Sequence, residues 1–222
     1  MFKQATLLRA LVAAAICTSS FAASAAAYTI DFNGVASGSN ANTDATAITN
    51  GVTFASGVYA DIVDGNFDVI GQHWVPYSLA TDGVDPAIFA RSPSGISWGT
   101  GSNALDARFD QVLVQFSSPS QLTGFSFNLD NSSFGNLQAS NILFLDADGK
   151  TVFTSSDFFQ NTATNFSVSF ASPLTVSAVL LPSGKLYDDV SVAAVPEPES
   201  YAMLLGGLGL LGFMSRRRRQ QV

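Results

Sequence analysis

The sequence predicts an all-β fold, an antiparallel β-sandwich of the jelly-roll type, over residues 28–195. The first observation is alternation, because apolar and polar residues follow one another with period two and no long stretch repeats every 3.6 residues. The second is the set of turn-forming residues, mostly Asn-Gly and Asp-Gly pairs, between the alternating stretches. The third is the chain's 18 phenylalanines, which supply an apolar inner face.

In chain order, these signals predict about ten short strands separated by turns. The clearest alternation runs through residues 28–32, 112–116, 125–129, 166–170 and 176–180, and a last strand covers 187–194. Turns are predicted at Asn50-Gly51, Asp64-Gly65, Asp82-Gly83, Pro93-Ser94-Gly95, Asp148-Gly149 and Ser183-Gly184. Residues 33–48 are rich in Gly, Ser, Asn and Ala, which indicates a long surface loop.

The first and last predicted strands bracket the domain, and their pairing would close the sandwich. A domain that ends on such a strand resembles jelly-roll carbohydrate-binding modules, where the terminal strands pair and an aspartate near the end often holds structural calcium. The resemblance implies a structural Ca²⁺ at Asp31, Asp188 and Asp189, whose carboxylate oxygens suit that ion. The alternative is that these three carboxylates are solvated at strand ends.

The charge of the central domain is strongly negative. Residues 28–195 hold fifteen aspartates, no glutamate and four basic residues, which gives a net charge of −11. A surface this acidic repels the phosphate backbone, so nucleic acid is excluded as a partner. The charge is compatible with divalent cations, with neutral glycans, or with solubility outside the cell.

Residues 1–27 have the organisation of a cleavable signal peptide. Lys3 and Arg9 form a basic region, an apolar stretch covers residues 10–16, and small residues precede a cleavage site after Ala27. The alternative is a retained N-terminal anchor, for which the apolar stretch is short. Cys17 is the only cysteine and follows Ile16, a poor match to a lipoprotein signal, so the mature domain is expected to contain no cysteine.

The C-terminal residues have three parts in a fixed order. Residues 195–200 read VPEPES, residues 201–214 are apolar and uncharged, and four arginines end the apolar span. This order resembles the PEP-CTERM sorting signal, and the matching residues are Pro196, Glu197, Pro198, Arg216, Arg217, Arg218 and Arg219. The arginines are expected to stay cytoplasmic, which leaves the Pro-Glu-Pro segment on the outer side of the membrane.

That resemblance implies processing by the membrane peptidase exosortase in a Gram-negative bacterium that makes exopolysaccharide. A precursor held transiently in the inner membrane by a short transmembrane helix would then be released to the cell surface or a biofilm matrix. The alternative is a plain tail anchor without processing. The domains are therefore expected at residues 1–27, 28–195 and 196–219.

The inventory of reactive side chains argues against an enzyme. Residues 95–99 fit the pattern G-x-S-x-G, but that motif needs a helix after the serine and a histidine later in the chain. The only histidine, His73, comes earlier. No catalytic residue is therefore assigned, and no cofactor beyond the candidate calcium.

Aromatic residues in Gly- and Pro-rich sequence are the candidate ligand-binding residues. Trp74, Tyr77 and Trp98 are expected on loops, where aromatic rings stack on sugars. The alternative is that the tryptophans cap the core beneath long loops. The sequence therefore predicts an exported protein that binds exopolysaccharide, with a structural or adhesive matrix protein as the second hypothesis.

Overall fold

The computed structural model describes residues 26–77, 90–91, 99, 103–108, 110–130, 141–155 and 165–195. The predicted turns at 82–83 and 93–95, most of the predicted signal peptide, and the C-terminal signal from residue 196 onward lie outside the described residues. Among the described helices, none has the length and apolar character needed to span a membrane.

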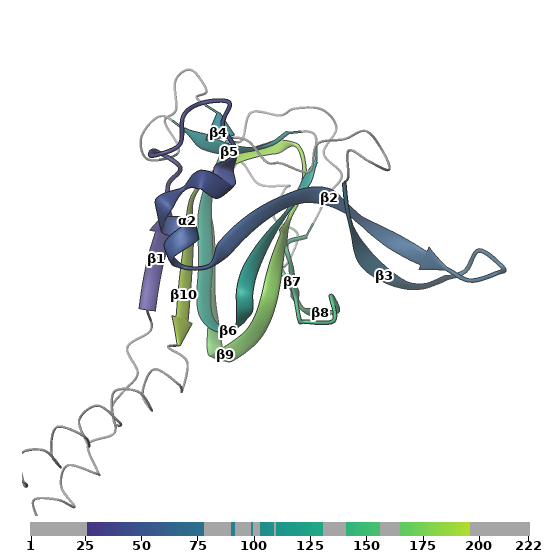
Figure 1. The fold of residues 1–222 in the computed structure, drawn as a ribbon. Coiled ribbons are helices and arrows are strands. Elements are labelled where there is room, and N and C mark those ends of the chain that lie inside the picture. The colour runs from purple at the N-terminus through teal and green to yellow at the C-terminus, as the bar shows by residue number, and fades with distance from the viewer. Residues whose placement is uncertain are drawn as a thin grey trace, which may run out of the picture.

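The described residues form ten strands and two short helices, which confirms the all-β prediction (Figure 1). The strands are β1 (Ala26–Ile30), β2 (Val52–Val63), β3 (Val69–Pro76), β4 (Ala90–Arg91), β5 (Ala104–Ala107), β6 (Gln111–Leu129), β7 (Leu143–Leu145), β8 (Thr151–Thr154), β9 (Asn165–Leu181) and β10 (Lys185–Val195). The helices are η1 (Ala41–Thr43) and α2 (Ala45–Thr49).

All described strand pairs are antiparallel and form one sheet, in the order β4-β5-β10-β6-β9-β7-β8. The sheet folds over into a sandwich because β6 and β9 run through both layers. The first part of β6 pairs with β2 and the second with β10, while β9 pairs with both parts. Figure 1 shows the two strands bending together at the bottom of the view.

Two interruptions in the β6–β9 ladder allow this bend. Residues are inserted in β6 between Gln115 and Ser120, and in β9 opposite the stretch from Leu122 to Gly124. Bulges bend strands and let them pass from one layer to the next. Pro119 and Pro173 lie at these two points, where a missing N–H is tolerated. The predicted short strands are therefore wrong here, since β6 and β9 have 19 and 17 residues.

The core between the layers is aromatic. Phe127 packs against Phe166 and Tyr187, with ring centroids 5.1 and 5.0 Å apart. Phe144 contacts Phe153 and Phe170, each at 5.4 Å. Most of these pairs meet edge to face, the arrangement that aromatic quadrupoles favour. This confirms that phenylalanine side chains of the predicted alternating strands fill the interior.

The segment after the first strand differs from the prediction. Strand β1 ends at Ile30, and Phe32 has a φ of 54° and a fully buried ring 5.3 Å from that of Phe54. Residues 33–48 hold η1 and most of α2 instead of a surface loop. The Asp44 carboxylate caps α2 by accepting from the N–H groups of Thr46 and Ala47. Burial of two helix alanines, at positions 41 and 47, fixes the segment against the core.

The terminal strands pair, as the sequence predicts. Strand β1 pairs with β10 from Ala26↔Ala194 to Ile30↔Val190. Both ends of the described domain therefore leave from the same edge of the sandwich (Figure 1). The strand begins at Ala26, two residues before the predicted boundary at Tyr28.

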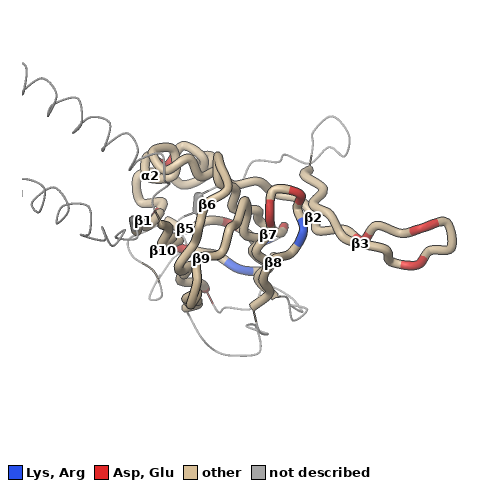
Figure 2. Tube along the Cα trace, turned by 90° about the horizontal axis from the view of Figure 1, so that it is seen from below, with Lys and Arg blue, Asp and Glu red and all other residues tan. Residues whose placement is uncertain are grey.

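Half of the β2–β3 hairpin projects from the sandwich. The ladder between β2 and β6 covers residues 52–57 of β2, and beyond Gly57 this strand pairs with β3 alone within the described part of the chain. We call residues 58–75 the arm, and Figures 1 and 2 show it extending away from both layers. Acidic residues follow its length at Asp61, Asp64 and Asp68 (Figure 2).

Candidate functional site

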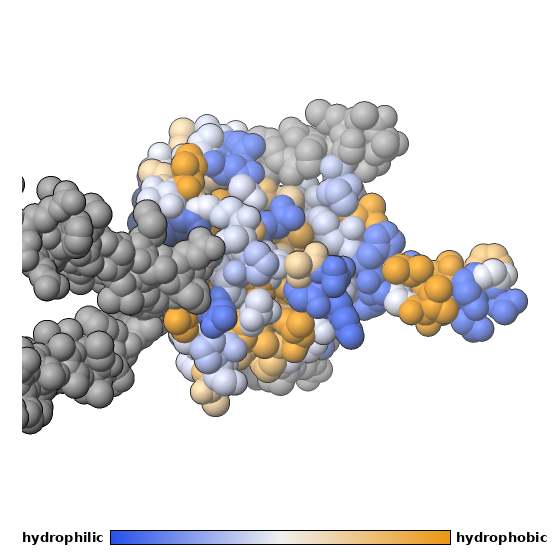
Figure 3. Space-filling model, turned by 60° about the horizontal axis from the view of Figure 1, so that its bottom comes forward, coloured by the Kyte–Doolittle hydropathy of each residue, from blue (hydrophilic) through white to orange (hydrophobic). Residues whose placement is uncertain are grey.

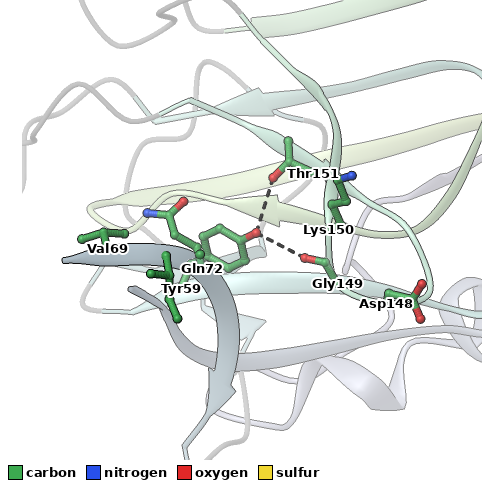
Figure 4. A pocket seen from close by; sticks show the side chains of 9 residues that line it. Tyr59, Val69, Gln72, Asp148, Gly149, Lys150 and Thr151 are labelled. Atoms are coloured by element: carbon green, nitrogen blue, oxygen red, sulfur yellow. Dashed lines mark hydrogen bonds between the residues drawn. The ribbon is translucent and has the colours of Figure 1, made fainter. Parts of the chain in front are cut away.

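An open cleft lies between the arm and the turn that joins β7 to β8. Its volume is about 710 Å³, within the range of small-molecule and saccharide sites. The arm contributes one wall and the turn the other (Figure 4). The lining residues are Tyr59, Val69, Ile70, Gly71 and Gln72 from the arm, and Asp148, Gly149, Lys150 and Thr151 from the turn and the start of β8.

The wall from the turn is a rigid hairpin loop. Asp146 Oδ1 accepts hydrogen bonds from the N–H groups of Asp148 (3.0 Å) and Lys150 (2.9 Å). Gly149 has a φ of 75°, the left-handed conformation that this loop requires and glycine tolerates. The predicted Asp-Gly turn is confirmed. It fixes the backbone that presents Lys150 and Asp148 to the cleft.

Tyr59 connects the two walls. Its hydroxyl donates to the Gly149 carbonyl at 3.2 Å and lies 3.4 Å from Thr151 Oγ1. Its main-chain N–H donates to Gln111 Oε1 at 2.7 Å, just where the β2–β6 ladder ends. The ring is therefore held in one orientation within the cleft (Figure 4). Tyr59 was not predicted as a site residue.

Trp74 lies directly opposite Tyr59 on β3, so the two side chains share one face of the arm. Trp74 is half-buried against a small cluster on the outer face of the sandwich that contains Leu113, Leu145, Ala178 and Leu180. The loop position predicted for Trp74 is wrong. The indole does not line the cleft itself. It continues the aromatic surface formed by Tyr59 toward the body of the domain.

Trp74 reaches that cluster because its indole packs closely over Gly57. A Cβ atom on Gly57 would lie 2.6 Å from Trp74 Cζ2 and would collide with the Val75 carbonyl oxygen as well. Only glycine therefore fits beneath the indole at this position.

Of the other predicted aromatic residues, Tyr77 follows β3 and is half-buried. Its N–H donates to the Ser56 carbonyl at 3.1 Å, and its side chain is not among those that line the cleft. Trp98 lies outside the described residues.

The polar groups of the cleft suit a ligand rich in hydroxyl groups. Gln72 Nε2 donates to Asp61 Oδ1 at 2.6 Å, which orients the amide and leaves its oxygen as an acceptor. Lys150 supplies an ammonium donor. Of the other described basic side chains, Arg108 is paired with Asp106 at 2.8 Å and Lys185 is buried. With Asp148 also present, the cleft offers donors and acceptors without a cationic surplus.

The three aspartates predicted to bind calcium are not gathered into one group. Asp31 follows Ile30, whose partner Val190 is next to Asp189, so β1–β10 pairing brings those two positions near each other. The Asp189 carboxylate accepts from Asn128 Nδ2 at 2.8 Å, and fully buried Asp188 accepts from the Asp189 N–H at 2.8 Å. Within the described ranges, no three Asp, Glu, His or Cys side chains lie close enough to hold a metal ion. Calcium binding stays a prediction.

The C-terminal signal was compared with protein-family models. Residues 194–219 match the PEP-CTERM protein-sorting motif. The match contains Pro196, Glu197 and Pro198 together with the arginines from Arg216 to Arg219, all outside the described residues. The PEP-CTERM motif indicates an exported protein that exosortase processes from a membrane-anchored precursor. Its first two matched residues, Ala194 and Val195, are the last residues of β10.

The comparison with curated proteins found no match to this chain. Among solved structures, the cleaved K2 adhesin domain of Lys-gingipain is similar over 75% of this chain and 97% of its own, with 13% identity and a TM-score of 0.38. The xylan-binding module CBM86 of Roseburia intestinalis is similar over 48% and 83%, at 14% identity and a TM-score of 0.28. The lectin domain of lectinolysin, solved with Lewis b antigen, has 12% identity and a TM-score of 0.27. The match covers 42% of this chain and 66% of the lectinolysin domain.

Proposed function

We propose that this protein works on the cell surface or in the extracellular matrix of a Gram-negative bacterium, where its sandwich binds a neutral polysaccharide without catalysing a reaction. The observation that carries the proposal is the cleft between the arm and the β7–β8 turn. There the Tyr59 ring is fixed by its hydroxyl, and the polar groups of Gln72, Lys150 and Thr151 surround it. A rigid aromatic ring with convergent hydrogen-bonding groups is the usual composition of a sugar-binding surface.

The negative charge of the domain favours a neutral polysaccharide over an acidic one. The domain has a net charge of −11, and two carboxylates, those of Asp61 and Asp148, lie at or beside the cleft against one ammonium group. An acidic polymer would be repelled over distances of about a Debye length, ~8 Å at physiological salt. Neutral hexose units avoid this cost and can use all of the donors and acceptors. The host's exopolysaccharide is the expected polymer.

The test is co-sedimentation of the processed protein with exopolysaccharide from the exporting organism. Lys150→Ala and Gln72→Ala should each weaken binding several-fold, since each removes a hydrogen-bonding group worth about 1 kcal/mol without disturbing the core. Trp74→Phe retains an aromatic ring on the outer cluster and should weaken binding less than Trp74→Ala.

A matched control is Ile48→Ala, which removes an apolar side chain that is 64% exposed on α2, a helix that contributes no residue to the cleft. It should bind like the wild type. Equal binding by the Lys150, Gln72 and Trp74 variants and this control would contradict the proposal, as would the absence of saturable binding by the wild type.

The second candidate function is a structural or adhesive matrix protein without a defined small ligand. The exposed apolar side chains of the arm favour it, because they offer a surface for contacts between proteins. The co-sedimentation assay separates the two: an adhesive protein would associate with cells or with itself but would not saturate with purified polysaccharide.

A further inference from the structure

The outer edge of β3 is available for another strand, as the direction of its main-chain groups shows. The Tyr77 N–H donates to the Ser56 carbonyl, so these two residues form a hydrogen-bonded pair of the β2–β3 ladder. Such pairs alternate along antiparallel strands with pairs whose main-chain groups point outward. In the observed register Trp74 and Gln72 belong to the outward set. Their N–H and C=O groups therefore point away from β2.

Strand β2 independently supports this direction of the main-chain groups of β3. Tyr59, which is opposite Trp74, should by the same rule point its N–H away from β3. It does, since that N–H donates to the Gln111 side chain. Among the described strands β3 pairs with β2 alone. Its outer edge thus presents a ladder of donors and acceptors along the arm.

The central part of the edge, residues 71–75, has none of the usual features that block pairing. Natural edge strands are protected by charged side chains, above all lysine, or by bulges, or they are very short. Strand β3 is eight residues long and contains no Asp, Glu, Lys or Arg. The bulge at Ile70 and the one proline, Pro76, lie at the two ends of the strand, which leaves residues 71–75 open between them. An edge of this kind is a template for strand addition.

The arm also exposes more apolar surface than a two-stranded hairpin can support alone. Phe67 is 85% exposed, Ile70 66% and Val69 59%, and the strand facing them adds Ile62 and Val63. Figure 3 shows this apolar surface on the arm, outside the sandwich. Isolated two-stranded hairpins are marginally stable in water, and a third and fourth strand would stabilise the arm.

We propose that two copies of this protein pair through their β3 strands, antiparallel about a two-fold axis that passes between their His73 residues. Charge selects this arrangement, because two acidic residues of the arm, Asp64 and Asp68, lie at its tip. Parallel pairing would place the two acidic tips side by side. Antiparallel pairing separates them to opposite ends of a four-stranded ribbon.

The proposed register is self-complementary. With the two His73 residues opposite each other, Gln72 of one copy and Trp74 of the second copy form the hydrogen-bonded pairs. Gly71 then faces Val75 of the second copy, and the ladder ends on each side at the bulge of one copy and Pro76 of the other. The two copies would each contribute the same residues, as a two-fold interface requires. The pairing is independent of glycan binding.

Cysteine cross-linking tests the axis in the full-length chain. In a Cys17→Ser background, His73→Cys would be the only cysteine. Residues in a non-hydrogen-bonded antiparallel pair have Cα atoms about 4.5 Å apart, which is within disulfide range. We expect a disulfide-linked dimer on a non-reducing gel from oxidised, exporting cells. Thr175→Cys, at an exposed position on β9, is the matched control. Cross-linking no greater than that of the control would overturn the proposal.

Molar mass by light scattering tests the edge without any cysteine and without glycan. The processed wild-type protein should have the mass of a dimer across a concentration series. Gln72→Pro removes the side-chain amide and the outward main-chain N–H, and it should give a monomer. Gln72→Thr removes the same amide but keeps the main-chain N–H, and it should stay dimeric. A monomeric wild type, or a dimer unaffected by Gln72→Pro, would refute the β3 interface. Because the light-scattering assay contains no polysaccharide, failure of the glycan proposal leaves its result interpretable.

Discussion

Tyr59 shows how much one side chain contributes to the proposed site. Its main-chain N–H ends the β2–β6 ladder on Gln111, and its hydroxyl reaches across the cleft to Gly149 and Thr151. The arm and the β7–β8 turn are distant in sequence, and the hydroxyl contacts of Tyr59 join them. The site therefore depends on one hydroxyl group for its geometry.

Tyr59→Phe tests that dependence. The ring stays, but the hydrogen bonds to the turn are lost, so the free energy of unfolding should fall by about 1 kcal/mol. Polysaccharide affinity should fall as well, because the ring is less rigidly held. Urea unfolding and co-sedimentation measure the two effects. Unchanged stability would show that the hydroxyl bonds contribute nothing in solution.

Two other tyrosines predict how stability depends on pH. Burial raises the pKa of Tyr28 to about 12 and that of Tyr187 well above its ordinary value of 10.0. Above pH 10 the unfolded chain therefore loses protons that the folded chain retains. The stability from these groups is fully present below pH 10 and should be lost as the pH rises toward 12 and beyond.

Urea unfolding at pH 8, 10 and 11 checks the direction of this change. Tyr187→Phe should reduce the slope above pH 10, although it also lowers stability at every pH because the Pro182 carbonyl loses its 2.7 Å hydrogen bond. Stability that rises between pH 10 and 11 would contradict the burial of these two hydroxyl groups.

At the scale of elements, the arm is the feature that decides function, and Gly57 is the residue where it leaves the sandwich. Gly57→Ala would force Trp74 and the Val75 carbonyl away from β2. We expect a loss of about 1–3 kcal/mol, the usual cost of overpacking. Gly65→Ala, at the tip where nothing lies within 4 Å, should change stability by less than about 0.5 kcal/mol. Equal effects in thermal denaturation would contradict the packing of Trp74.

The two hairpin tips share one hydrogen-bonding pattern but have different residues at its left-handed position, and this difference gives another prediction. In the arm, Asp64 Oδ1 accepts from the N–H groups of Asn66 and Asp68, as Asp146 does in the β7–β8 turn. Phe67, with a φ of 66°, occupies the left-handed position that Gly149 fills in the other turn. Phe67→Asn should relieve about 1 kcal/mol of strain and slow amide hydrogen exchange at the tip about fivefold. Faster exchange would mean that the exposed ring itself stabilises the tip.

Elements that depend on local sequence could be predicted better than those that depend on tertiary packing. Asp148-Gly149 and Asp64-Gly65 were correctly identified as turns, because side-chain caps and left-handed residues act within a few positions. Phe32 was wrongly placed in a strand and Trp74 in a loop, because contacts with Phe54 and with the outer cluster decide their conformations. The cleft could not be predicted, since Tyr59 meets Gly149 only after β2 leaves the sandwich.

At the scale of the molecule, the described hydrophobic core is built from residues of the sandwich. Both hydrophobic clusters lie between Ile30 and Val192, and the strands of the described chain pair within residues 26–195. The sorting motif begins at Ala194, and Ala194 and Val195 are the last residues of β10. Folding and sorting are therefore expected to be separable.

Deleting residues 196–222 tests this separation. The shortened protein should unfold at the same temperature as the processed wild type, yet it should no longer reach its surface or matrix location. Cell fractionation and thermal denaturation measure the two properties. Normal delivery of the shortened protein would contradict the role assigned to the C-terminal signal.

The most direct test of the binding cleft is amide hydrogen exchange of the processed protein with and without the host's exopolysaccharide. The account predicts slower exchange in residues 57–76 and 146–151, the two walls of the cleft. It predicts little change around Gly124 of β6, which is not part of the cleft. Protection elsewhere, or no protection at saturating polysaccharide, would contradict the assignment of the cleft as the glycan-binding site.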